Sequence, residues 1–192
     1  MKNTKALHLF AALVCFTFFP QVVQSGVSTP VKGDHFPDII LSVPENPLDK
    51  AYLGLKEKDT FKLSQIKADL LIIEVFSMYC PYCQREAPLL NDLFDVISKR
   101  TDIRDKVKII GIGAGNTPFE VSVFQKQYNV PFPLVPDQSF AVHKVVGEVR
   151  TPYFFVLKKN ADGSNLIVYS KVGSIQDPNQ FLALILNETA LK

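Results

Sequence analysis

The sequence contains no tryptophan, only 2 methionines and 3 cysteines, and no marked excess of charge of either sign. The 21 Lys and Arg exceed the 19 Asp and Glu by two, and two of the lysines, Lys2 and Lys5, lie near the start. The rest of the chain is therefore balanced in charge. Without a basic excess there is no electrostatic footprint for nucleic acid, so we predict no nucleic-acid partner. With 9 glycines, 13 prolines and 47% hydrophobic residues, the chain is neither collagen-like nor of low complexity. Its 192 residues suit one well-buried core.

The apolar stretch near the N-terminus is too short to span a membrane. It covers residues 6–19, whereas a spanning helix needs about 20 apolar residues. The positive charges of Lys2 and Lys5 before it, and the small residues around Ser25 after it, are typical of a secretory signal. We therefore predict that residues 1–25 are a signal peptide cleaved near Ser25. An uncleaved membrane anchor and a buried first helix are the alternatives.

The predicted export determines which cysteines remain in the mature chain and in which redox environment they lie. Cys15 lies within the apolar run after the bulky Leu13 and Val14, which argues against a lipid-attachment site. The mature chain then keeps Cys80 and Cys83 only. We expect a periplasmic or secreted protein, or a membrane-anchored one if the signal is not cleaved, in an oxidising compartment where disulfides persist.

The rest of the chain alternates short apolar runs with helical patterns. Residues 26–50 are rich in Pro, Gly, Ser and Asp, which predicts an extended lead-in without a helix. Residues 61–66 suit a short strand or turn. Beyond them, the expected strands are 70–76, 107–112, 132–135, 152–157 and 167–172, and the expected helices are 81–97, 118–128, 139–146 and 177–191. This order predicts an α/β fold in which helices cover both faces of a mixed central sheet, as one domain over 26–192.

Two cysteines enclose Pro81 and Tyr82 where a predicted buried strand gives way to a helix. A helix N-terminus offers unpaired N–H groups and partial positive charge, which stabilise a thiolate. Pro81 fits the first helical turn because it lacks an N–H and its φ is already set. We predict that Cys80 is the exposed attacking thiolate, which forms a mixed disulfide with a partner, and that Cys83 is the thiol that resolves it.

Two other uses of the cysteine pair fit the sequence less well. A structural disulfide across a two-residue gap restrains little chain and therefore stabilises little. A zinc site needs about four ligands, whereas His35 and His143 are single and distant from the cysteines. We predict no metal site.

Two further positions favour redox chemistry. Glu74 lies inside the apolar run that precedes the cysteines, where an unpaired carboxylate is costly. Burial would raise its pKa into the range useful for proton transfer with Cys83, unless alternation points it to solvent at a sheet edge. Thr151 and Pro152 begin another apolar run, and a cis bond between them would turn a backbone edge toward the cysteines for a substrate to pair with.

Seven motifs are spread over most of residues 31–190. They are Gly33-Asp34-His35-Phe36-Pro37-Asp38, Glu74-Val75-Phe76-Ser77, Cys80-Pro81-Tyr82-Cys83, Pro88, Phe132-Pro133-Leu134-Val135-Pro136-Asp137, Thr151-Pro152 and Asp162-Gly163. Together they resemble the thioredoxin superfamily, specifically the secreted TlpA/ResA-like thiol–disulfide oxidoreductases of AhpC/TSA-redoxin type.

This resemblance implies a thioredoxin-like fold with an N-terminal extension and an inserted β-α segment between the first helix and Pro152. It places Glu74 at the family's buried acid, and Thr151 and a cis Pro152 at the substrate-binding turn, beside Pro81, Tyr82 and Tyr79. Tyr79 departs from the family's usual tryptophan, and the Pro81-Tyr82 dipeptide is similar to that of glutaredoxins, which bears on the redox potential.

The resemblance also implies protein thiols and disulfides as substrates. It favours reduction over oxidation, with a redox partner, membrane-bound in some settings, that recharges the cysteine pair. No organic cofactor is needed because the cysteines carry the electrons. One alternative is a peroxiredoxin-like thiol peroxidase, although Ile73 replaces the proline of that family's P-x-x-x-T-x-x-C motif and Ser77 its threonine. Another is a copper-handling protein that binds Cu(I) through the two thiolates, near Met78.

Overall fold

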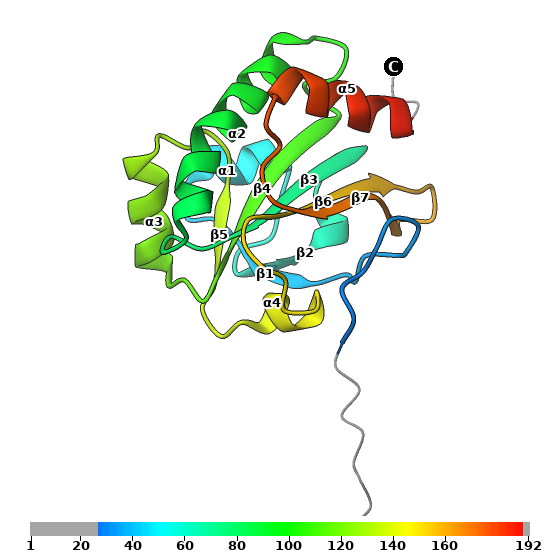
Figure 1. Ribbon diagram of the computed structural model, residues 1–192. Helices are drawn as coiled ribbons and strands as arrows, with labels where there is room; N and C mark the ends of the chain where they lie inside the picture. Colours follow the sequence, from blue (N-terminus) through cyan, green and yellow to red (C-terminus); the bar gives the residue numbers. More distant parts are fainter. Residues whose placement is uncertain (1–26, 190–192) are drawn as a thin grey trace, which may run out of the picture.

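The computed structural model describes residues 27–189 (Figure 1). The predicted signal peptide, residues 1–25, and the end of the last predicted helix beyond residue 189 lie outside the described residues. Within the described part, no helix is both long and apolar enough to cross a membrane.

A mixed five-stranded sheet forms the centre of the molecule. Its strand order is β5-β4-β3-β6-β7, in which β3 is parallel to β4 and antiparallel to β6. Every residue of β3 is buried, as expected of a strand with neighbours on both sides and layers on both faces. The strands are β3 (Leu70–Phe76), β4 (Val107–Ala114), β5 (Leu134–Asp137), β6 (Tyr153–Lys159) and β7 (Asn165–Val172). The predicted mixed sheet is confirmed.

Alternate residues of β3 face two separate hydrophobic clusters. Leu70, Ile72 and Phe76 pack with side chains of α2 (Pro81–Lys99), α3 (Pro118–Gln127) and α5 (Pro178–Thr189). Leu71, Ile73 and Val75 pack on the other face with the N-terminal segment and α4 (Ala141–Val145). The prediction that both faces are covered is therefore correct, and Glu74 falls in register with the residues that face α2.

The N-terminal segment contains more regular structure than predicted. A helix, α1 (Pro47–Leu53), lies partly within the stretch expected to be extended, and β1 (Ile40–Ser42) pairs with β2 (Thr60–Lys62), which leads into a 3₁₀ turn (Leu63–Gln65). The Asn46 side chain accepts a hydrogen bond from the Leu48 N–H at 3.0 Å, Pro47 occupies the first turn, and Gly54 ends the helix with φ 69°. Pro47 therefore belongs to the first turn of a capped helix and does not mark extended chain.

Strand β4 also continues past its predicted end. The strand was expected to end at residue 112 but ends at Ala114, so that Gly113 also lies within β4. Gly111 is part of the same strand, and a Cβ on it would lie 2.4 Å from the side chain of Leu134, its partner on β5, so the glycine leaves room for that side chain. β5 and α4 then occupy the inserted β-α segment, which confirms that part of the prediction.

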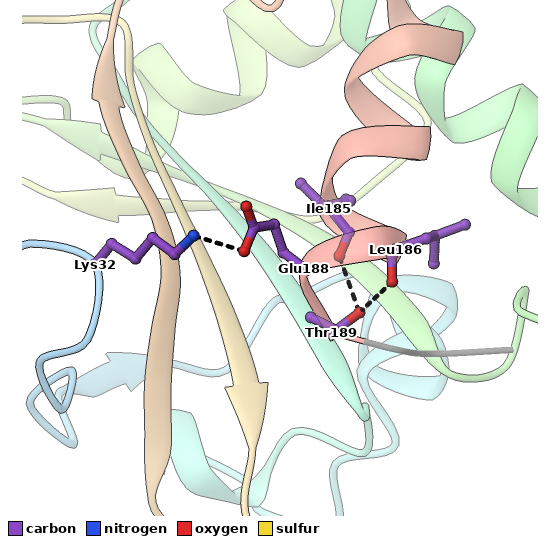
Figure 2. Close-up of polar contacts among 5 residues, drawn as sticks. All are labelled: Lys32, Ile185, Leu186, Glu188 and Thr189. Carbon is purple, nitrogen blue, oxygen red and sulfur yellow. Dashed lines mark hydrogen bonds and ion pairs between the residues drawn. The ribbon is translucent and has the colours of Figure 1, made fainter.

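The start of the described chain is extended and covers the edge of β7. The Gly33 N–H donates to the Ile167 carbonyl and the Ile167 N–H to the Asp34 carbonyl, both at 2.9 Å. Such pairing protects an exposed sheet edge. Figure 2 shows a further link, in which the Lys32 ammonium contacts the Glu188 carboxylate of α5 at 2.5 Å. Because both side chains are largely solvent-exposed, this ion pair adds little stability.

Candidate active site

The loop between β3 and α2 holds Cys80 at the N-cap of the helix. Two amide side chains fix its backbone at Met78. The Met78 N–H donates to Asn116 Oδ1 at 2.9 Å, and Gln84 Nε2 donates to the Met78 carbonyl at 2.8 Å. The Cys80 N–H donates to the Ser77 carbonyl at 3.0 Å. The position of the first cysteine is thus set by hydrogen bonds with three residues, Ser77, Gln84 and Asn116.

The Cys80 thiol is partly exposed and lies against the turn before β6. Its sulfur donates to the Thr151 carbonyl oxygen at 3.3 Å. Partial burial raises the pKa of this thiol, but hydrogen bonds from the Thr151 side chain, from Cys83 and from the Tyr82 backbone outweigh that effect, so the net pKa is lowered. The arrangement favours a thiolate at a surface position, as a nucleophile requires.

The Cys83 thiol has the opposite environment. Its side chain is fully buried, and both cysteines are present as free thiols. Burial raises the pKa of Cys83 first, and the negative charge of Glu74 and the hydrogen bond to Cys80 raise it further. A thiol held protonated in this way needs a proton acceptor before it can attack a neighbouring sulfur.

Glu74 is buried in the middle of the central strand, with 2% of its surface exposed. The alternative that it points to solvent at a sheet edge is therefore wrong, because β3 lies between β4 and β6. Its Oε1 has no hydrogen-bond partner in the structure. Burial raises the pKa of this carboxyl well above its ordinary value, and the nearby Glu86 and Cys80 raise it further.

Glu86 is a second buried acid that the sequence analysis did not single out. It lies one helical turn after Cys83 on α2, is 2% exposed, and accepts a hydrogen bond from the Ile175 N–H at 2.8 Å. Burial raises the pKa of Glu86, while its hydrogen bonds with Ser174 and Ile175 lower it. The only signal in the sequence was its position three residues after Cys83, which places both side chains on one helix face.

The remaining predicted site residues surround Cys80. The bond between Thr151 and Pro152 is cis, and Pro81 is the first residue of α2. Tyr79 and Tyr82 are each 67% exposed, on either side of the cysteine. The Tyr79 hydroxyl donates to the Glu120 carboxylate, and the Arg85 guanidinium lies 4.6 Å from the centre of the Tyr82 ring. The fold thus brings together all eight predicted site residues, which come from three separate segments.

Within residues 27–189, no three His, Cys, Asp or Glu side chains gather as a metal centre would require. The geometry around the two cysteines is that of a dithiol with a buried carboxylate beside its inner sulfur.

A model of the AhpC/TSA family matches residues 33–168, which is most of the chain. The chain belongs to the AhpC/TSA family. Among its relatives, the thiol-disulfide oxidoreductase ResA of Geobacillus thermodenitrificans is 23% identical over 165 residues, which cover 86% of this chain and 84% of that protein. ResA of Bacillus thuringiensis subsp. konkukian is 26% identical over 104 residues, which cover 54% and 57% of the two chains.

Solved structures show the same fold as this AhpC/TSA protein. A provisionally named thiol:disulfide interchange protein DsbE from Chlorobium tepidum superposes with a TM-score of 0.63 at 16% identity, covering 82% of this chain and 97% of its own. StoA from Bacillus subtilis superposes with a TM-score of 0.54 at 19% identity, covering 81% and 99%. The predicted thioredoxin-like fold and the resemblance to TlpA/ResA-like proteins are confirmed. The predicted enzyme class is supported over the peroxidase alternative, since these relatives are named for disulfide exchange.

Proposed function

We propose that the protein is an extracytoplasmic thiol–disulfide oxidoreductase that uses Cys80 and Cys83 to reduce disulfides of other proteins. The observation that carries this proposal is the contrast between the two thiols on one turn of α2. Cys80 is partly exposed and has a lowered pKa, whereas Cys83 is buried with a raised pKa beside the Glu74 carboxyl. A nucleophile and a protected resolving thiol need these two environments.

The exchange proceeds in two steps. The Cys80 thiolate attacks one sulfur of the substrate disulfide, so that a mixed disulfide forms and the other substrate sulfur leaves and takes a proton from water. In its ionised form, Glu74 then accepts the Cys83 proton, and the Cys83 thiolate attacks the Cys80 sulfur. The Cys80–Cys83 disulfide forms, and the second substrate sulfur leaves as a thiolate and takes a proton from water. The substrate gains the two electrons that the cysteine pair loses.

Several parts of this proposal rest on the sequence. Residues 1–25 act as a signal peptide, and 26–192 form one thioredoxin-like domain outside the cytoplasm. After each turnover a partner with a low-potential thiol pair, which can be membrane-bound, reduces the Cys80–Cys83 disulfide again. Named relatives are thiol-disulfide oxidoreductases, which supports protein thiols as the substrate class.

Insulin reduction tests the proposal directly. With dithiothreitol as the source of electrons, the native protein accelerates insulin precipitation and Cys80→Ser abolishes the acceleration. Cys83→Ser retains the attacking thiol and accumulates mixed disulfides that are visible on a non-reducing gel. Full activity of Cys83→Ser without trapped adducts would overturn the assignment of the two cysteines.

The equilibrium reduction potential decides the direction of electron flow. After equilibration with glutathione buffers, the reduced fraction of the Cys80–Cys83 pair gives the potential. A value near about −270 mV indicates a reductant, and one near about −120 mV indicates an oxidant. The second result would contradict the proposed reductive role while leaving the exchange chemistry intact.

A further inference from the structure

A groove runs alongside the cysteine pair, between α2 and the adjoining ends of β6 and β7. It encloses about 440 Å³. Its apolar surface includes Leu89, Pro152 and Val172, of which Val172 is 50% exposed. The Gly173 N–H donates to the Pro152 carbonyl at 2.9 Å, which closes the wall between the two strand ends. An exposed apolar surface next to a reactive side chain is typical of a binding groove.

The groove adjoins the reactive sulfur through Thr151. Thr151, whose carbonyl accepts the Cys80 thiol at 3.3 Å, is itself part of the groove wall, and so is Tyr82. A protein segment whose cysteine forms a disulfide with Cys80 therefore lies next to this surface. The residues that flank the partner's cysteine are the ones that the groove can select.

The exposed charged side chains of the groove are both basic. Arg85 and Arg150 line it from opposite sides, one on α2 and one before the cis bond, and both are exposed. Neither forms an ion pair within residues 27–189, although Arg85 stacks on Tyr82. The acid in the wall is Glu86, whose carboxylate is buried and accepts the Ile175 N–H. Glu148, two residues before Arg150, is not among the lining residues.

We propose that this groove binds an extended segment of the partner protein that carries an acidic side chain close to its reactive cysteine. Arg85 and Arg150 bind the carboxylate, for which the planar guanidinium is suited, and Leu89, Pro152 and Val172 contact an apolar neighbour of the cysteine. The inference rests on the proposed function, because it assumes that Cys80 forms a mixed disulfide with the partner.

The test uses single turnovers of the prereduced full-length protein with short synthetic peptide dimers joined through one cysteine each. In the reaction, one peptide disulfide becomes two thiols and the Cys80–Cys83 pair becomes a disulfide. The peptides differ only in carrying Glu, Gln or Lys at one position near the cysteine, which is varied in turn on either side. The measured quantity is the second-order rate constant, expressed as the Glu/Gln and Glu/Lys ratios for each protein.

For the native protein we expect a Glu/Gln ratio of about 5–10 at the best position, because two partly exposed charge pairs contribute modestly each. The ratio should fall toward one in Arg85→Gln/Arg150→Gln and in about 0.5 M salt, where charges are screened. Arg104→Gln is the matched control. It removes the same charge at an exposed position whose guanidinium lies beside Asp105, 3.5 Å away and outside the groove, and it should preserve the native ratio.

The ratios separate this inference from the proposed function. Because each ratio is taken within one protein, a general loss of thiol reactivity in a variant cancels. A Glu/Gln ratio near one in the native protein at every position, or an equal ratio in the native and double-substituted proteins, would overturn the groove's proposed selectivity. A fall of the Glu/Gln ratio toward one in Arg104→Gln would also overturn it, because the selectivity would then come from the net charge of the protein and not from the groove. Failure to reduce any peptide, or the small neutral hydroxyethyl disulfide, would instead contradict the exchange activity itself.

Discussion

Cys80 and Cys83 lie on the same turn of one helix, yet their surroundings differ in every property that controls thiol chemistry. Cys80 is at the helix N-cap, partly exposed and bordered by the tyrosines at 79 and 82. Cys83 is fully buried on the face that packs against the sheet, near Glu74. The surroundings lower the pKa of the first thiol and raise that of the second.

This comparison shows that three residues of helix are enough to separate an attacking sulfur from a protected one. Position i faces the end of the helix, where N–H groups are unpaired, and position i+3 faces the core. The difference therefore follows from where the helix meets the sheet.

Alkylation should show the largest effect. With Cys83→Ser to isolate Cys80, and Cys80→Ser to isolate Cys83, we expect iodoacetamide at pH 7 to react at least about 100-fold faster with Cys80, because the thiolate is the reactive form and Cys83 is also buried. Mass spectrometry of quenched samples gives both rates. In urea the two rates should converge, since both thiols then have the same surroundings. Equal rates in the folded protein would contradict the comparison.

Replacement of the buried acid Glu74 tests the surroundings of the Cys83 thiol. Glu74→Gln keeps the size of the side chain but removes the proton acceptor, so resolution of the mixed disulfide should slow by up to about 100-fold, the lower end of what positioned acid–base groups contribute. Stopped-flow measurement of the release of the second substrate thiol gives this rate. Attack by Cys80 should change much less.

The same variant has a stability consequence whose sign follows from the pKa. The folded protein holds a proton on Glu74 above the ordinary value of 4.5, where the unfolded chain has released it. Native stability therefore falls as pH rises from about 4.5, and Glu74→Gln removes this loss. Urea midpoints should show the variant gaining on the native protein between pH 4 and pH 8. A constant difference over that range would show that Glu74 does not titrate abnormally.

The local pattern around the cysteines was predictable, but the partners supplied by distant segments were not. The Cys80-Pro81-Tyr82-Cys83 spacing and the acid in a buried strand followed from residues 70–83. In contrast, Glu86 resembled any other helical acid until the helix face was known, and the groove depends on Arg150 and Val172, which are far away in sequence. The prediction of extended chain over 26–50 was wrong for residues 47–50, because Asn46 caps a helix that Gly54 ends, so that Pro47 belongs to a first helical turn.

Asn116 tests how the outer thiol is positioned. Its side chain is fully buried and accepts the Met78 N–H, so Asn116→Ala leaves that donor unpaired and should lower the free energy of unfolding by about 1–3 kcal/mol. The rate of Cys80 alkylation should fall as the loop before it loses its fixed position. Gln84→Ala removes the other hydrogen bond to Met78 from a more exposed side chain and should cost less. Equal costs would indicate that burial does not set the contribution of these contacts.

Removal of the Tyr79 hydroxyl should have the smallest effect of these substitutions. The bond from this hydroxyl to the Glu120 carboxylate lies at the surface, where such contacts contribute little. Tyr79→Phe should therefore keep the rate of insulin reduction within about threefold of the native rate, as expected for an exposed pair. Tyr79→Ala, which removes the ring next to Cys80, should lose more, because the ring supplies apolar contact area for a docked partner. A Tyr79→Phe variant as slow as Tyr79→Ala would contradict this expectation. The exposed polar contact near Cys80 would then matter to exchange as much as the buried contacts around Cys83. Burial alone would no longer explain the contrast between the two thiols.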